Sequence, residues 1–399
     1  MNLAIPTWIA GLLACGMGVA LLGSVMVVLA QRLKMDEARV GGLVSMFGFA
    51  MIPVMLAMGF LTDLIDKQIV VVIGSFLMVV SLLVLSRATK YWSALLAVLL
   101  LSAGWSALVN VLNVLMQAAF GGTEVYAMNL GNFFFGLGAF LTPLVIAFLL
   151  KRAGFVPALL VLAALALTSG VLALGVDFEA FAAAGVQKPA AEPAAVEIAA
   201  PGVGLLLGDS IMWLTALALL FYAPMEATMA AWATTYLGDK GMSEGRAATL
   251  LSGFWLAFMC SRLATALLVW KFGLPAGGET VLIIVLSVLC LLVWAGAVFS
   301  PGRAMAGAMV VLAGLVFGPT FPTIIGVLMG HVKTNISPDL GGRAVGLFFM
   351  IGGIGWSVIP ILIGAYARKT SVQRGFLIAV AAGVGLTAVA VGLHLVAGG

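Results

Sequence analysis

The sequence predicts an all-α membrane protein whose twelve transmembrane helices form two pseudo-symmetric six-helix bundles. Three observations support this prediction: the composition, the number of long apolar segments and an internal repeat. Hydrophobic residues make up 63% of the 399 residues and charged residues only 9%, whereas soluble domains carry about 25% charged residues. A water-soluble fold cannot bury so much apolar surface, so lipid is the expected solvent.

Twelve segments are apolar and long enough to cross a bilayer, which takes roughly 20 residues per helix. The first is longer than the core of a signal peptide and no basic region precedes it, so we expect it to be retained as a span. The tenth contains two prolines within Gly318–Pro322, and we expect a kink there. The predicted spans are residues 5–31, 39–62, 68–87, 91–120, 125–150, 154–176, 207–237, 245–271, 279–299, 303–331, 341–367 and 373–396.

A polar segment divides the spans six and six. Residues 177–201 are rich in Ala, Pro and Glu and have no hydrophobic periodicity, which is typical of an exposed linker. We therefore expect an N-terminal six-helix bundle at residues 1–176, a central linker at residues 177–206 and a C-terminal six-helix bundle at residues 207–399.

The two halves repeat each other. A shift of 207 residues aligns Met35–Met51 with Met242–Phe258, with identical residues at seven positions, and a shift of 217 aligns Ala127–Ile146 with Ala344–Ile363. Two matches in the same order and at nearly the same shift indicate a parallel repeat of six helices, an architecture known among secondary transporters.

Several function classes are excluded by what the sequence lacks. The net charge is only +4 and the basic residues gather at the ends of apolar segments, which fits interfacial anchoring and no nucleic-acid partner. Cys15, Cys260 and Cys290 lie inside apolar segments, and His331 and His394 lie near span ends. There is no phosphate-binding loop, metal-spaced cluster or catalytic triad, so we expect neither an enzyme nor a metal or organic cofactor.

Glu226 and Arg262 are the ionisable side chains predicted to lie deep in the bilayer. Such groups cost about 2.5–3.5 kcal/mol on insertion scales and normally face a cavity or a partner. Pro224 precedes Glu226, and Tyr222 shares its helical face. We interpret Glu226 as a substrate ligand or proton carrier, Tyr222 as a substrate contact and Arg262 as a coupling residue. The alternative is a structural ion pair between Glu226 and Arg262, which would require a long reach of the arginine.

Amide side chains cluster on two neighbouring predicted spans. Asn110, Asn113 and Gln117 are spaced i, i+3, i+7, and Asn129 and Asn132 are spaced i, i+3. Amides both donate and accept hydrogen bonds, as polyhydroxyl ligands require, so the four asparagines are candidate substrate ligands. The alternative is hydrogen bonding between packed helices, which we favour for Gln117 because it lies close to a span end.

Tryptophans lie inside spans, although membrane tryptophans usually sit at interfaces. Trp232 and Trp255 are the candidates for stacking against a sugar ring, and Trp255 shares a face with Arg262. Bulky packing is the alternative for each tryptophan.

The segment Gly59–Lys67 resembles the loop signature of the major facilitator superfamily, because Gly59, Asp63 and Lys67 match the pattern. The usual further basic residues are missing. In that family this loop is cytoplasmic and gates the inner side through charge contacts, so the resemblance implies a gating role for these three residues.

Within the superfamily, the chain resembles the fucose/glucose–galactose permease group of sugar symporters. The resemblance lies in Met128–Leu144, in the preceding stretch VNVLNVL and in Glu226–Trp255. It implies that Glu226, Trp232, Asn113 and Asn129 line a central cavity. Proton-coupled relatives carry a carboxylate in the first helix, but residues 8–30 contain none. This argues against proton coupling through the N-terminal half and leaves Glu226 as the candidate proton acceptor. Coupling to H⁺, coupling to Na⁺ and facilitated diffusion all stay open.

The family orientation conflicts with the distribution of basic residues. The resemblance places both termini and the linker in the cytoplasm, but only five Lys and Arg then face the cytoplasm and thirteen face the other side. The positive-inside rule predicts the reverse. We keep the family orientation, since the acidic linker and the Gly59–Lys67 loop belong on one side.

The expected function is secondary active transport of a small polyhydroxyl solute, a sugar, by alternating access. The alternatives are an efflux transporter for an amphipathic or cationic compound and a membrane sensor that carries no flux. We expect a monomer embedded in the lipid bilayer as a multi-pass protein of the bacterial inner membrane. The sequence names neither the solute, the driving ion nor the direction of transport.

Overall fold

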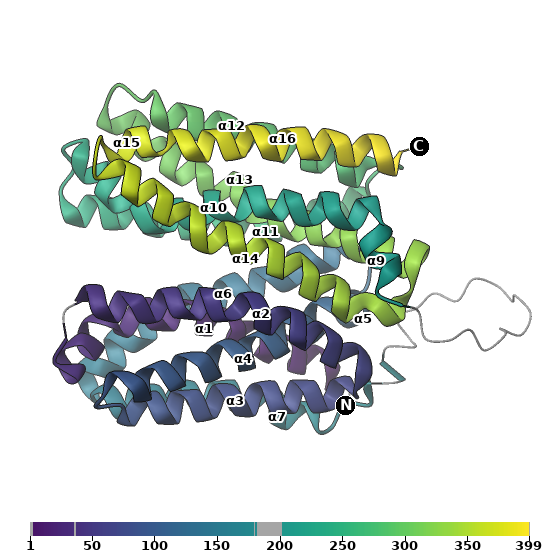
Figure 1. The fold of residues 1–399 in the computed structure, drawn as a ribbon, viewed down its shortest axis with the longest axis horizontal. Coiled ribbons are helices and arrows are strands. Elements are labelled where there is room, and N and C mark those ends of the chain that lie inside the picture. Colours follow the sequence, from purple (N-terminus) through teal and green to yellow (C-terminus); the bar gives the residue numbers. More distant parts are fainter. Residues whose placement is uncertain (1–2, 36, 179, 182–201, 399) are drawn as a thin grey trace, which may run out of the picture. The chain divides into compact units, whose positions relative to one another are not determined.

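The computed structural model describes residues 3–35, 37–178, 180–181 and 202–398, and within them every regular element is a helix (Figure 1). The first half contains α1 (Ala4–Leu33), α2 (Glu37–Leu64), α3 (Lys67–Arg87), α4 (Tyr91–Val114), α5 (Met116–Phe120), α6 (Glu124–Arg152) and α7 (Phe155–Ala173). The second half contains α9 (Gly204–Gly208), α10 (Ser210–Asp239), α11 (Glu244–Phe272), α12 (Gly278–Val298), α13 (Arg303–His331), the π-helix η1 (Val332–Ile336), the 3₁₀-helix η2 (Pro338–Leu340), α14 (Gly341–Ala367), α15 (Val372–Gly375) and α16 (Leu377–Ala397).

Twelve stretches of helix in the described part of the chain are long and apolar enough to cross a membrane, six before the predicted linker and six after it. The prediction of an all-helical membrane protein with twelve spans is confirmed. Large apolar side chains such as Leu144, Phe148 and Leu292 are exposed on these helices, as expected where lipid replaces water.

Most predicted spans differ from the observed helices by a few residues at their ends, and two of them are divided. The span predicted at residues 91–120 is divided at Leu115 into α4 and α5, and the span predicted at residues 373–396 is divided at Phe376 into α15 and α16. The span predicted from residue 207 starts instead at Ser210. Asp209 caps this helix by accepting a hydrogen bond from the backbone N–H of Met212.

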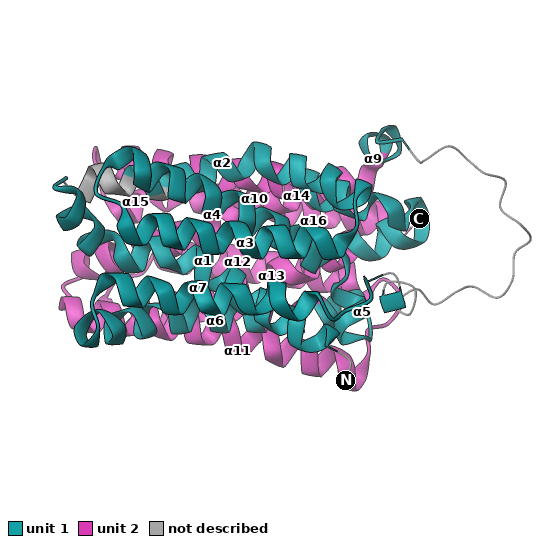
Figure 2. Cartoon of the chain, turned by 90° about the horizontal axis from the view of Figure 1, so that it is seen from below, with its two compact units in different colours: residues 1–127, 134–208, 329–347 teal, residues 128–133, 209–328, 348–399 magenta. Residues whose placement is uncertain are grey.

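The chain forms two compact units, shown in different colours in Figure 2. Unit 1 comprises residues 1–127, 134–208 and 329–347, and unit 2 comprises residues 128–133, 209–328 and 348–399. The division into bundles at residues 1–176 and 207–399 stays a prediction. Of the predicted linker at residues 177–206, residues 179 and 182–201 lie outside the described residues.

Glycine permits the close helix contacts that position the polar residues of both units. In unit 1, a Cβ on Gly59 of α2 would lie 2.6 Å from the carbonyl oxygen of Gly342 in α14. In unit 2, a Cβ on Gly318 of α13 would lie 2.3 Å from the carbonyl oxygen of Phe258 in α11. Small residues let backbones of membrane helices approach in this way.

Candidate functional site

Glu226 and Tyr222 form a hydrogen-bonded pair on α10 in unit 2. They are four residues apart and therefore share a helical face. The Tyr222 hydroxyl lies 2.7 Å from Oε2 of Glu226 and 2.7 Å from the carbonyl oxygen of Phe317 in α13. Tyr222 is 1% exposed, whereas Glu226 is half-buried. The structure therefore connects Glu226 to α13 through Tyr222.

Arg262 of α11 is directed toward backbone carbonyls. It is 2% exposed; its Nε donates to the carbonyl of Gly318 at 2.8 Å and its Nη1 donates to the carbonyl of Asn132 at 3.1 Å. Pro322 has no N–H, so the carbonyl of Gly318 one turn earlier lacks its helical donor and is open to the guanidinium. The sequence contained this signal in the prolines of α13, but it did not identify the bond.

Glu226 and Arg262 do not form the ion pair that the sequence offered as an alternative. The guanidinium is occupied by Gly318 and Asn132 and lies over the ring of Phe258, 4.1 Å from its centroid. The two charges still interact electrostatically. Arg262 is thus a buried cation that joins α11 to α13 and to the short part of α6 in unit 2, without a carboxylate bonded to it.

Asn129 and Asn132 lie in that short part of α6, residues 128–133. The amide of Asn129 lies 3.4 Å from Oγ1 of Thr323, and the amide of Asn132 donates to the carbonyl of Met128 at 2.9 Å. Both asparagines are buried. The structure brings them into the same unit as Glu226 and Arg262, and it adds Thr323, which sequence reasoning missed.

Asn110 and Asn113 lie on α4 in unit 1. The amide of Asn110 donates to the carbonyl of Gly342 at 3.0 Å, and the amide of Asn113 donates to the carbonyl of Val109 at 2.7 Å. The side-chain oxygens of both residues are buried and have no hydrogen-bond partner within the described part of the chain. Each asparagine therefore uses its donor within the protein and keeps its acceptor unsatisfied.

The two candidate tryptophans are half-buried and lie in different surroundings within unit 2. Trp232 packs against Gly364, where a Cβ would lie 2.7 Å from the indole ring. Trp255 makes an edge contact with Phe258 at 5.5 Å between ring centroids, and Phe258 in turn lies under Arg262. Trp255 and Arg262, which share a helical face, therefore both contact the ring of Phe258.

The residues predicted to act as a gate lie at the end of α2 and the start of α3, in unit 1. Asp63 accepts hydrogen bonds from the backbone N–H groups of Gly342 at 2.7 Å and Arg343 at 2.9 Å. Its Oδ2 lies 3.5 Å from Nε of Arg343, and its side chain is 3% exposed. Asp63 thus binds the N-terminus of α14, where a carboxylate is favoured. Lys67, the first residue of α3, interacts electrostatically with Asp63.

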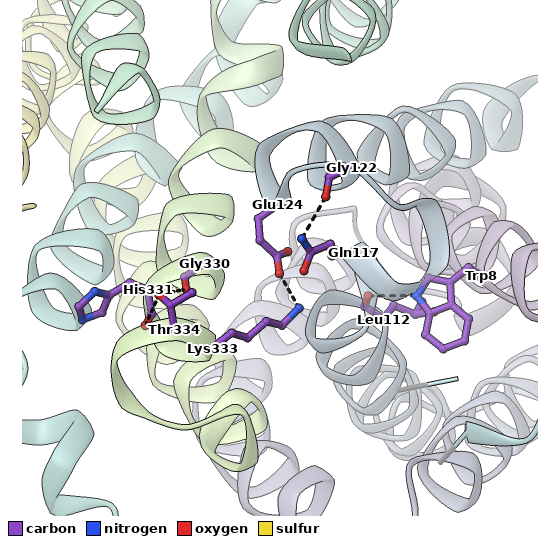
Figure 3. Close-up of polar contacts among 9 residues, drawn as sticks. All are labelled: Trp8, Leu112, Gln117, Gly122, Glu124, Gly330, His331, Lys333 and Thr334. Atoms are coloured by element: carbon purple, nitrogen blue, oxygen red, sulfur yellow. Dashed lines mark hydrogen bonds and ion pairs between the residues drawn. The ribbon is translucent and has the colours of Figure 1, made fainter. Parts of the chain in front are cut away.

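A second charged contact in unit 1 was missed from the sequence. Nζ of Lys333 in η1 donates to Oε1 of Glu124, the first residue of α6, at 2.5 Å (Figure 3). The side chain of Glu124 is 6% exposed and that of Lys333 is 22% exposed. Nothing in the spacing of Glu124 and Lys333, 209 residues apart, indicated their contact.

Gln117 was expected to be structural. Its amide donates to the carbonyl of Gly122 at 3.0 Å.

The candidate site residues and the charged contacts described above fall into three groups: Glu226, Tyr222, Arg262 and Asn129 in unit 2, the asparagines of α4, and the charged contacts of α14 and η1. No group of three or more His, Cys, Asp or Glu residues that could hold a metal ion occurs within the described ranges. Hydrogen bonding and electrostatics are the chemistry that these groups offer to a small molecule.

Comparisons with known proteins identify the family and the fold of this chain. The sequence profile of the Major Facilitator Superfamily matches residues 8–360. Two structures of FucP are similar to this chain: one in the outward conformation, with a TM-score of 0.77 and 15% identity, and one of a variant of this E. coli fucose:proton symporter, with a TM-score of 0.71 and 16% identity. Each comparison covers 98% of this chain and 99% of the other.

The human organic anion transporter MFSD10 is also similar in structure, with a TM-score of 0.73, 13% identity and coverage of 97% of this chain and 99% of the other. No curated protein matches the sequence. At these identities the structural likeness establishes the fold, while the profile covers most of the chain and establishes the family. The chain belongs to the Major Facilitator Superfamily and is an integral, multi-pass membrane transporter, not an enzyme.

Proposed function

We propose that the protein is a secondary active transporter that carries a sugar or a similar small polyhydroxyl solute and couples its movement to protons. Asn110, Asn113, Asn129 and Asn132 are the proposed hydrogen-bonding ligands, with Glu226 as the proton carrier. The proposed setting is the bacterial inner membrane, with the linker and both termini in the cytoplasm, and the proposed oligomeric state is a monomer.

The observation that carries this proposal is the pair of unsatisfied amide oxygens on α4. The side chain of Asn110 is fully buried and that of Asn113 is 5% exposed, yet neither Oδ1 accepts a hydrogen bond. A buried acceptor without a donor costs about 1–3 kcal/mol. Such groups call for an explanation, and the hydroxyl groups of a sugar are donors of the right kind.

Unit 2 offers groups of complementary chemistry. The half-buried indole rings of Trp232 and Trp255 offer apolar faces against which a pyranose ring can stack. Arg262 is already bonded to two carbonyls, which favours a structural and electrostatic role for it over direct solute binding.

The structural relatives favour a sugar without deciding it. FucP is described as a fucose:proton symporter, whereas MFSD10 is described as an organic anion transporter. An organic anion would need cationic ligands, but the guanidinium of Arg262 is turned to backbone carbonyls. An organic cation would need Glu226 but not the amides. The unsatisfied amide oxygens therefore favour the polyhydroxyl solute among the three.

Counterflow in proteoliposomes tests the proposal, because it measures exchange without a driving ion. The panel contains labelled neutral sugars, an organic anion and an organic cation. We expect counterflow of at least one sugar, and a loss of affinity of about two- to twelvefold in Asn113→Ala, since one hydrogen bond contributes about 0.5–1.5 kcal/mol. Gln117→Ala is the matched control, because this amide bonds the Gly122 carbonyl. Counterflow of only the cation or the anion would refute the proposal.

A further inference from the structure

The hydroxyl group of Tyr222 takes part in two short contacts but has a single hydrogen. Both neighbouring atoms, Oε2 of Glu226 and the carbonyl oxygen of Phe317, lie 2.7 Å away, the usual distance for an O–H···O hydrogen bond. A carbonyl oxygen can only accept, so the hydroxyl hydrogen of Tyr222 must be donated to Phe317 if that contact is a hydrogen bond. The contact with Glu226 then needs a hydrogen from the carboxyl group.

Tyr236, on the same helix, provides an internal comparison. Its hydroxyl also makes two contacts of 2.7 Å, one with the carbonyl oxygen of Ala297 and one with Oγ of Ser300. Here both contacts are satisfied without any ionisable group, because Ser300 can donate to Tyr236 while Tyr236 donates to Ala297. At Tyr222 the position of the serine hydroxyl is taken by a carboxyl oxygen, which can donate only when it is protonated.

We infer that Glu226 binds the transported proton on Oε2 and donates it in a hydrogen bond to Tyr222, which donates its own hydrogen to the carbonyl of Phe317. Tyr222 is therefore a positioning residue for the coupling proton, and not a solute ligand as its place beside Glu226 first indicated. This inference rests on the proposed function, because it assigns the proton site of the proposed symporter.

The positive charge of Arg262 on α11 favours the ionised form of Glu226. Its guanidinium bonds two carbonyls and forms no ion pair with Glu226, so the two contacts of the Tyr222 hydroxyl, and not a neighbouring charge, call for the carboxyl hydrogen. The thiol of Cys290 in α12 faces Tyr222 and carries no charge to the site in its ordinary form. The helices α13, α14 and α16 carry their charged or titratable residues only at or near their ends.

Release of the proton changes how α10 contacts α13. The deprotonated carboxylate can only accept, so the single hydrogen of Tyr222 can no longer satisfy both neighbours. Either the contact between Tyr222 and Phe317 is lost, or that between Tyr222 and Glu226 becomes a repulsive approach of two oxygens. Phe317 directly precedes Gly318, whose carbonyl accepts the hydrogen bond of Arg262. The protonation state of Glu226 therefore acts on the turn of α13 that Arg262 also binds.

Infrared difference spectra of the purified protein in lipid, recorded between acidic and alkaline pH, test the inference. We expect a carboxylic acid C=O band that disappears at alkaline pH, is absent in Glu226→Gln, and moves to higher frequency in Tyr222→Phe, since the acid then loses its acceptor. Tyr236→Phe is the matched control and should leave the band unchanged. A band unaffected by Tyr222→Phe, or no acid band from Glu226, would overturn the inference.

Transport measurements separate this inference from the proposed function. Glu226→Gln retains a donor to Tyr222, so it should keep sugar counterflow and lose pH-driven accumulation. Tyr222→Phe should also keep counterflow, with coupling reduced. Absence of sugar counterflow in the wild type would refute the sugar substrate but leave the spectroscopic result standing. Pronounced loss of counterflow in a folded Tyr222→Phe variant, with coupling of the remaining flux unchanged, would make Tyr222 a solute ligand and refute the positioning role.

Discussion

The contact between Asp63 and the N-terminus of α14 gives the sharpest quantitative prediction. The first N–H groups of a helix have no acceptor within it. Gly342 and Arg343 are the second and third residues of α14, and their N–H groups donate to the two carboxylate oxygens of Asp63. The change Asp63→Asn keeps the shape of the side chain, removes its charge and turns one acceptor into a donor.

The magnitude follows from these contacts. A hydrogen bond to a charged group contributes about 1.5–3 kcal/mol, and a carboxylate at a helix N-terminus contributes about 0.3–1 kcal/mol. The 3.5 Å approach of the Arg343 guanidinium adds little more. Asn retains one acceptor, so we expect Asp63→Asn to weaken the local structure by about 2–4 kcal/mol, which corresponds to a factor of roughly 30 to 1,000.

Hydrogen exchange measures this factor directly, because Asp63 is the acceptor that protects the two amides. In a peptide spanning residues 338–350, exchange at Gly342 and Arg343 should accelerate by that factor in Asp63→Asn. Asp66→Asn is the matched control, since Asp66 caps α3 through Gln68 in the same loop. Equal exchange in the wild type and Asp63→Asn would refute the view that Asp63 holds α14, and with it the proposed gating role.

Three further predictions concern other contacts of unit 1. Gly59→Ala places a methyl group 2.6 Å from the carbonyl oxygen of Gly342, so it should destabilise this contact by ~1–3 kcal/mol and raise exchange in the same peptide; unchanged exchange would contradict the packing. Lys333→Met removes the lysine from the Glu124 carboxylate, whose side chain is 6% exposed, so it should lower the free energy of unfolding by ~1–3 kcal/mol. Adding Glu124→Gln removes the buried charge and should restore part of the loss in thermal unfolding. Asn113→Leu removes an unsatisfied acceptor, so its Tm should not fall, while solute should no longer raise the Tm; retained stabilisation by solute would contradict the ligand role.

The fold was largely predictable because hydropathy reports on the solvent that each segment faces. The spans predicted at residues 303–331 and 341–367 match α13 and α14 residue for residue, since charged or turn-forming residues flank both. One boundary error occurs where a single side chain decides the start of the helix. Asp209 caps α10, but one capping residue does not change a hydropathy averaged over about 20 residues.

The individual residues of the candidate site were predictable from their polarity, but their partners were not. Glu226 and Arg262 are conspicuous in apolar helices, and their spacing along the sequence says nothing of the carbonyls of Phe317 and Gly318 to which Tyr222 and Arg262 are bonded. Those acceptors are backbone atoms, and every residue has one. The missing N–H of Pro322 is the feature of the sequence that indicated the open carbonyl of Gly318 in α13.

Contacts that join distant segments were hidden for a similar reason. Asp63 was predicted to act as a gate from the Gly59–Lys67 pattern, but its acceptor role at α14 depends on how helices 279 residues apart meet. The pair of Glu124 and Lys333 has no local signature at all. Pairwise contacts of this range require the folded chain, because sequence periodicity reports only which face of a helix is apolar.

Sugar-induced charge movement in proteoliposomes on a solid-supported membrane tests the central claim, proton-coupled sugar transport, most directly. Addition of a sugar identified by counterflow should produce an inward positive current in sodium-free buffer, and Glu226→Gln should abolish the steady current while retaining counterflow. A current that requires sodium, or an equal steady current in Glu226→Gln, would contradict proton coupling through Glu226. No counterflow and no current with any sugar would contradict sugar transport itself.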